Sequence, residues 1–203
     1  MNIVYIHGNN ATATSFDFIR SCIVDHSEIL VKYNSSTGFY SNHKNMLRHL
    51  DGEKDIFFVA HSLGGIHALH LAHHLGDRVI GGVTLSTPYG GSSVADAMAC
   101  FMPFCPVMND IRSTSRPIVE ARRIKPPRVW TNIVTTAGAT PFMFEPNDGV
   151  VAIQSMRDRR DIRLVDVHCN HFDVVSSKRT VDVLLHSINE ALSADADELV
   201  CTQ

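Results

Sequence analysis

Residues 55–65 read DIFFVAHSLGG, and this stretch decides how the rest of the chain is interpreted. Its apolar run at 56–59 shows no polar alternation, which is typical of a parallel β-strand covered on both faces. A turn rich in small residues follows, and then the helical pattern IHALHLAHHL at 66–75. The stretch therefore predicts a central strand, a sharp turn and a helix, with Ser62 on the turn.

A serine on such a turn has the sequence context of a nucleophile elbow, in which a strained turn exposes the hydroxyl. The usual pattern is G-x-S-x-G, and this chain has Ala60 in place of the first glycine. Small residues around the serine allow two backbone segments to approach closely. Taken alone, Ser62 followed by two glycines fits a plain turn or a helix cap as well as an elbow.

Further strands alternate with helices along the chain. Apolar runs predict strands at 2–6, 28–33, 79–86, 128–136 and 162–167. Helices are predicted at 43–51 and 176–193, and another begins with Thr14 or Ser15 as its N-cap. This alternation indicates an α/β fold with a mostly parallel, doubly wound sheet and helices on both faces.

Residues 88–127 interrupt the alternation of strands and helices. They hold six of the eight prolines together with the apolar segment VADAMACFMPFCPVM at 94–108. This composition is too hydrophobic for a linker, so we interpret 88–127 as a small, mostly helical cap or lid above the sheet. Ordinary core packing is the alternative for its Met and Phe side chains. The rest of the pattern indicates a single domain spanning 1–203.

Composition and charge exclude several classes of protein. Hydrophobic residues make up 44% and charged residues 19%, as in ordinary globular proteins. A net charge of -3 without a basic cluster argues against nucleic acid as a partner. No apolar run approaches the roughly 18–20 residues of a membrane span, and no signal peptide is visible. Five cysteines without C-x-x-C spacing then predict free thiols and a cytoplasmic protein, whereas a Cys100–Cys105 disulfide would require export.

Two later loops offer partners for a serine nucleophile, which needs a base and an acid that orients the base. The loop after the strand at 128–136 contains Asp148, and the loop after the strand at 162–167 contains His168 and His171. Ligands of open parallel sheets bind at the carboxyl ends of the strands, where both loops lie. The order serine, acid, histidine is the order found in α/β-hydrolases.

Several segments resemble the α/β-hydrolase superfamily, in particular its small bacterial lipases and esterases. Together they run from residue 3 to about residue 175 and therefore cover nearly the whole chain. The segments are YIHGNN at 5–10, AHSLGG at 60–65, LSTPYGGSSVADAM at 85–98, NDGVV at 147–151 and NHFDVV at 170–175. The resemblance implies the α/β-hydrolase fold.

The resemblance also implies roles for individual residues. Ser62 matches the nucleophile, His171 the general base and Asp148 the acid. The oxyanion hole would use the backbone N–H groups of Leu63 and Asn9. Lipases usually have an apolar residue at the position of Asn9. The asparagine in this chain leaves the role of the backbone N–H intact, but it changes the expected shape and polarity of the acyl pocket. This chemistry requires no metal and no organic cofactor.

Other residues compete for these roles. His168 is the rival base, although its position fits a strand end. Asp173 fits a local hydrogen bond beside His171, and His61 fits a structural or pocket-lining role. The rival acids are Asp110, Asp161 and Asp166. His67, His70 and His74 share one helix face, where a metal site competes with an outer face that carries histidines.

The residues and the resemblance together predict a serine ester hydrolase of the lipase or carboxylesterase type. Its partner would be a small-molecule or lipid-like ester with an apolar acyl part, and contact with a lipid interface stays open. A thioesterase, a deacylase or an acyltransferase would use the same three side chains and the same acyl-enzyme. A non-catalytic binding module with a hydrolase fold is the alternative from a different class.

Overall fold

One parallel sheet organises the molecule. The structure is a computed structural model that describes residues 1–98, 100–101, 104–127, 129–141 and 143–201, the last seven by their backbone alone. Six strands form the sheet in the order β2-β1-β3-β4-β5-β6, and each neighbouring pair is parallel. The strands are β1 Asn2–Ile6, β2 Ser27–Val31, β3 Ile56–His61, β4 Val79–Leu85, β5 Val129–Thr135 and β6 Arg163–Val167. The prediction of a parallel α/β sheet is confirmed, with strand ends shifted by one or two residues.

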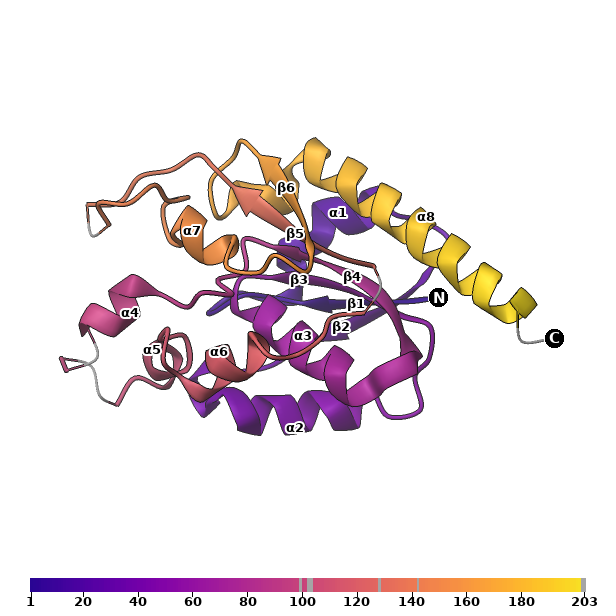
Figure 1. The fold of residues 1–203 in the computed structure, drawn as a ribbon, viewed down its shortest axis with the longest axis horizontal. Coiled ribbons are helices and arrows are strands. Elements are labelled where there is room, and N and C mark those ends of the chain that lie inside the picture. Colours follow the sequence, from indigo (N-terminus) through magenta and orange to yellow (C-terminus); the bar gives the residue numbers. More distant parts are fainter. Residues whose placement is uncertain (99, 102–103, 128, 142, 202–203) are drawn as a thin grey trace.

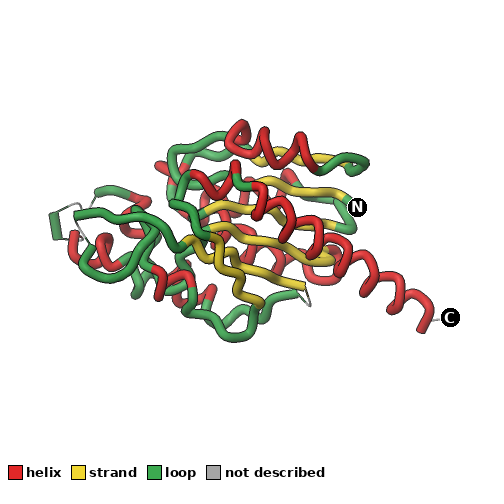
Figure 2. Tube along the Cα trace, turned by 90° about the horizontal axis from the view of Figure 1, so that it is seen from above, coloured by secondary structure: helices red, strands yellow, loops and turns green. Residues whose placement is uncertain are grey.

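Helices cover both faces of the sheet (Figure 1). One face carries α2 (Phe39–His49), α3 (Leu63–Leu75) and α6 (Arg116–Ala121), and the other carries α1 (Asp17–Cys22) and α8 (Lys178–Cys201). The shorter α4 (Ser93–Met98), α5 (Pro106–Asp110) and α7 (Ile153–Met156) gather beyond the carboxyl ends of the strands. Figure 2 shows α8 extending past the opposite end of the sheet. Of the segment 88–127, predicted as a cap, only the part that carries α4 and α5 therefore lies beyond the carboxyl ends of the strands, where ligands of such folds bind, whereas α6 packs on a face of the sheet.

The all-apolar run of β3 is explained by the two cores. Phe58 and Ala60 pack in the core under α2 and α3, whereas Phe57 and Val59 pack in the core under α1 and α8. Successive side chains of a strand point to opposite faces, so a strand buried on both faces needs apolar residues at every position. Because β3 lies between β1 and β4, its carboxyl end lies near the middle of the row formed by the carboxyl ends of the six strands.

Two predicted helix starts are wrong. The N-cap expected at Thr14 or Ser15 is absent, because these residues belong to a 3-10 turn over Ala13–Phe16 and α1 begins only at Asp17. The helix predicted at 43–51 begins earlier, at Phe39. Its first turn is capped from a distant segment, since the carboxylate of Asp110 accepts a hydrogen bond of 2.8 Å from the backbone N–H of Phe39.

The histidines of α3 lie inside the protein and not on an outer face. His67 is fully buried and stacks on Phe39 with ring centroids 4.0 Å apart. His70 is also buried, and its Nε2 donates to the carbonyl oxygen of Pro117 at 2.9 Å, whereas His74 is exposed. The expectation of an outer face was wrong for the first two because α2 and α6 cover it. Within the described ranges, no group of three or more His, Cys, Asp or Glu side chains is arranged to hold a metal ion.

The burial of His67 leads to a prediction of how acid affects the stability of the protein. Neither of its ring nitrogens has a hydrogen-bond partner among the described residues. Burial, followed by the nearby rings of His43 and His70, lowers the pKa of His67 well below its ordinary value. An unfolded histidine takes up a proton near about pH 6.5. Below that pH the unfolded state therefore binds a proton that the folded state rejects, and stability falls as the pH falls.

We expect His67→Phe to lose less stability than the wild type between about pH 7 and pH 5. The difference in slope should approach about 1.4 kcal/mol per pH unit below about pH 6.5, the value for one proton. Urea unfolding at each pH measures it, and any packing cost of the larger ring is the same at every pH. His49→Phe, at an exposed position of α2, is the matched control. Equal slopes for His67→Phe and the wild type would contradict the prediction.

Candidate active site

Ser62 occupies a strained turn between β3 and α3. Its φ of 52° and ψ of -123° lie in a backbone region that residues other than glycine rarely adopt. The two glycines that follow make this turn possible. A Cβ on Gly64 would collide with the carbonyl oxygen of Ile6, and a Cβ on Gly65 would collide with the side chain of Thr87. Thr87 also donates a hydrogen bond of 3.2 Å to the Ser62 carbonyl, which ties the turn to the end of β4.

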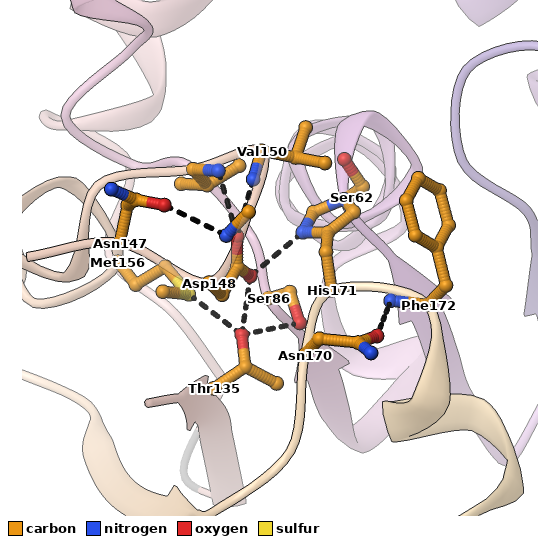
Figure 3. A network of polar contacts seen from close by, with 12 residues as sticks. Ser62, Ser86, Thr135, Asn147, Asp148, Val150, Met156, Asn170, His171 and Phe172 are labelled. Atoms are coloured by element: carbon orange, nitrogen blue, oxygen red, sulfur yellow. Dashed lines mark hydrogen bonds and ion pairs between the residues drawn. The ribbon is translucent and has the colours of Figure 1, made fainter. Parts of the chain in front are cut away.

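His171 and Asp148 meet on two loops at the same edge of the sheet. His171 lies on the loop after β6, and its Nδ1 is 2.8 Å from Oδ2 of Asp148, on the loop after β5 (Figure 3). The backbone N–H of His171 also donates to the carbonyl oxygen of Asp148 at 3.0 Å. Both side chains are buried, and the Asp148 side chain is inaccessible to solvent. Two hydrogen bonds therefore fix the histidine relative to the carboxylate.

The carboxylate of Asp148 is held in its charged form. Burial alone would disfavour that charge, but hydrogen bonds from His171, from the hydroxyl of Thr135 and from the backbone N–H of Val151 outweigh it, so the pKa of Asp148 lies below its ordinary value. The N–H of Val150 adds a bond of 3.0 Å. A charged Asp148 accepts a hydrogen bond from Nδ1–H of His171, which keeps that proton on Nδ1 and leaves Nε2 of the imidazole free to accept a proton.

Ser62 lies beside this pair. Figure 3 shows its side chain next to the imidazole of His171. The ring of His61, the residue directly before Ser62, has its centroid 4.8 Å from that of His171. Among the described residues the Ser62 hydroxyl has no hydrogen-bond partner, and such contacts are often long before substrate binds. The structure thus brings the three side chains singled out from the sequence to one edge of the sheet.

The rival residues are engaged elsewhere. His168 is exposed, and its Nδ1 lies 3.4 Å from the hydroxyl of Thr136. Asp110 caps α2, Asp161 pairs with Arg159, and Asp166 pairs with Arg157 at 2.6 Å. Asp173 accepts a hydrogen bond of 2.6 Å from the side chain of Asn170. None of these described contacts joins a rival acid to His171.

The two backbone donors expected for an oxyanion hole line one cavity with Ser62. Leu63 is the first residue of α3, so its N–H has no acceptor within the helix and lies at the positive end of the helix dipole. Asn9 lies on the loop after β1, directly after Gly8, and its side-chain oxygen accepts a hydrogen bond of 2.7 Å from Ser35. Ser62, Leu63 and Asn9 all face the same cavity of about 300 Å³.

The wall of this cavity is mostly apolar. The segment at 88–127 and the loop that carries Asp148 supply most of its side chains. These are Val94, Val107, Met108, Ile111, Met143, Val150 and Val151. Phe101 and Phe104 of the same segment are exposed, and Met102 lies outside the described residues. The segment 88–127 therefore supplies part of the cavity wall beside Ser62 and part of the apolar character of that cavity.

Several neighbours of these residues carry no sequence motif. Thr135 donates to Asp148, and the hydroxyl of Ser86 lies 2.9 Å from that of Thr135. Tyr33 stacks on His7 with ring centroids 4.4 Å apart, and its hydroxyl donates to the His7 carbonyl at 2.9 Å. The available signal was position alone, because Ser86 and Thr135 come at the carboxyl ends of two adjacent predicted strands.

Comparison with known proteins places the fold. No protein-family model and no curated protein sequence matches the chain. Among solved structures, the mature Bacillus licheniformis lipase BlEst2 aligns over 92% of this chain and 91% of its own, with 16% identity and a TM-score of 0.65. A lipase-esterase related protein from Clostridium acetobutylicum aligns over 91% and 93%, with 13% identity and a TM-score of 0.66.

An ancestral haloalkane dehalogenase matches equally well, over 95% of this chain and 92% of its own, with 10% identity and a TM-score of 0.67. Another match of this kind is an α/β superfamily hydrolase from Oenococcus oeni, with 12% identity and a TM-score of 0.64. The chain therefore has the α/β-hydrolase fold. In the part of the chain that is described, none of the helices combines the length and the apolar composition of a membrane span.

Proposed function

We propose that this protein is a serine hydrolase that cleaves carboxylic esters with an apolar acyl part. The observation that carries the proposal is the 2.8 Å contact between His171 and Asp148, formed beside Ser62 at an apolar cavity. The strained backbone of Ser62 supports it, because backbone strain of this kind is concentrated at functional sites.

Each side chain has a defined step in this reaction. The Ser62 hydroxyl oxygen attacks the ester carbonyl carbon while Nε2 of His171 accepts the hydroxyl proton. The imidazolium then protonates the departing alkoxide, which leaves an acyl-serine. Water then attacks the acyl carbon and passes a proton to Nε2 of His171. The imidazolium returns this proton to the Ser62 oxygen as the bond between that oxygen and the acyl carbon breaks, which releases the carboxylic acid and restores the Ser62 hydroxyl. Asp148 holds the Nδ1 proton and stabilises the imidazolium in both halves of the reaction.

The backbone of two residues would stabilise the tetrahedral oxygen. The N–H of Leu63 and the N–H of Asn9 belong to residues that line the cavity with Ser62. Removing one such donor costs about 3–4 kcal/mol of transition-state stabilisation in serine proteases. The apolar wall beside them favours a hydrocarbon acyl group over a charged one, since burying an unpaired charge is costly.

The fold narrows the chemistry without selecting the substrate. Proteins named as lipases share it, which supports ester cleavage, and a haloalkane dehalogenase shares it as well. The assignment of esters therefore depends on the local site and not on the fold. Transfer of the acyl group to an alcohol or an amine, or cleavage of a thioester, would begin with the same acyl-serine.

A fluorophosphonate probe tests the proposal directly. We expect folded protein to be labelled at Ser62, located by peptide mass spectrometry, and protein unfolded beforehand to stay unlabelled. A panel of p-nitrophenyl esters and acyl thioesters, with water, alcohols and amines as acceptors, then identifies the preferred reaction. If folded protein stays unlabelled under conditions in which a known serine hydrolase reacts, the catalytic assignment is wrong and a binding module becomes the better account.

A further inference from the structure

His61 has no role in the reaction described above, although it is the last residue of β3 and directly precedes Ser62. Its side chain is buried, with 6% of the residue exposed. Its Nε2 lies 2.9 Å from the backbone carbonyl oxygen of His171. A carbonyl oxygen only accepts hydrogen bonds, so the ring proton of neutral His61 resides on Nε2 and His61 is the donor.

This bond completes a clamp on the backbone of His171. The N–H of His171 donates to the carbonyl oxygen of Asp148 at 3.0 Å, and the carbonyl of His171 accepts from His61 at 2.9 Å. The peptide groups on both sides of the His171 Cα are therefore fixed. One is held by the loop of the acid and the other by His61 at the end of β3, directly before Ser62. The position of the imidazole depends on both.

The same ring packs against the loop that carries Asn9. A Cβ added to Gly8 would lie 2.9 Å from Nδ1 of His61 and 3.2 Å from the Cβ of Ser62. This distance leaves no room for a side chain at Gly8, so the loop rests directly on the His61 ring. The buried imidazole of His61 thus touches the loop of the base and the loop of an oxyanion donor, and the backbone of His61 is joined to Ser62 by a peptide bond.

The charge state of His61 suits this position. Burial, followed by the adjacent ring of His171, lowers the pKa of His61 to about 3. The titratable groups that face His61 are His171 on the loop after β6, Asp148 on the loop after β5 and His7 on the loop after β1. His61 therefore stays neutral near neutral pH, and it does not repel the positive charge that forms on His171 during catalysis.

We propose that His61 is a positioning residue that sets the placement of His171 relative to Ser62 and Asn9. The bond from its Nε2–H to the His171 carbonyl holds the base within reach of the Ser62 hydroxyl. The inference rests on the proposed serine hydrolase function. A merely structural histidine would fill the same space without needing the donor.

Two substitutions separate the donor from the volume. His61→Leu removes the donor and keeps a side chain of similar size, whereas His61→Gln keeps a side-chain N–H donor. We expect His61→Leu to lower kcat for a p-nitrophenyl ester by about 10–100-fold with KM changed less than about threefold, because misplacement of about 1 Å costs rates of this order. His61→Gln should recover to within about fivefold of the wild-type kcat. His49→Leu, at an exposed site on α2, is the matched control.

A second readout needs no catalysis. Nitrogen NMR of the wild type should show neutral His61 with its proton on Nε2, and amide exchange at residues 169–173 should accelerate in His61→Leu and not in His61→Gln. Equal loss of kcat in both variants, a change in KM alone, or a proton on Nδ1 would overturn the inference. If the wild type neither reacts with fluorophosphonate nor cleaves esters, the proposed function fails, and the NMR results alone decide whether His61 holds the loop. If His61→Leu does not fold, the position of the ring proton in the wild type and the kcat and amide exchange of His61→Gln test the role of His61.

Discussion

Ser62→Ala is expected to lower kcat for p-nitrophenyl esters by about a thousandfold or more. Removing the nucleophile of a serine hydrolase leaves only the contribution of substrate binding and the oxyanion donors. Two other hydroxyls, those of Ser92 and Thr140, line the same cavity. Of these three described residues, Ser62 alone has a positive φ, and Figure 3 shows its side chain beside the imidazole of His171. The loss of kcat is measured from initial rates of purified protein, at concentrations high enough to exceed the activity of contaminating esterases. Active-site titration of the wild type gives the concentration of reactive serine.

Two comparisons make this experiment decisive. Ser193→Ala removes an exposed hydroxyl on α8, whose only described bond is to the carbonyl of Asn189, and should keep wild-type kcat. Circular dichroism and urea unfolding of both variants check that the fold is intact. Ester turnover that persists in Ser62→Ala with an unchanged kcat would show that another group attacks the substrate, and the assignment of Ser62 would be wrong.

The part of the site that could be predicted from sequence follows from the geometry of a parallel sheet. An apolar run without alternation identified β3, and side chains just beyond strand ends had to gather at one edge. Ser62, Asp148 and His171 were accessible to this reasoning because each follows a recognisable strand. Strand order brings the ends of these strands to one side of the molecule, and the order of the three residues along the chain matched the α/β-hydrolase pattern.

Contacts between distant segments could not be predicted in the same way. The cap of α2 is a carboxylate at Asp110, in a segment that no local pattern links to Phe39. The burial of His67 depends on α2 and α6 covering α3, which its own helical period does not show. The hydrogen bond from His61 to the His171 carbonyl joins the end of β3 to the loop after β6, and only their folded positions reveal it. Such contacts are set by tertiary packing and not by local propensity.

His171→Ala is expected to lower kcat by about a thousandfold or more, whereas His168→Ala should keep kcat within about threefold of the wild type. The two histidines differ in their partners. His171 is buried with Nδ1 2.8 Å from Asp148, and His168 is exposed with only a 3.4 Å contact to Thr136. Proton transfer from Ser62 requires an imidazole oriented by an acid, and only His171 has one among the described contacts.

The pair of variants also tests the direction of proton transfer. Free imidazole added to His171→Ala should restore part of the activity, because a small base can enter the space that the side chain leaves, and it should have no effect on His168→Ala. Fluorophosphonate labelling should slow in parallel with kcat, since the serine is activated by the same base. Loss of turnover in His168→Ala with activity retained in His171→Ala would reverse the assignment. Asp148 would then have no histidine to orient, because its side-chain bond is made to His171.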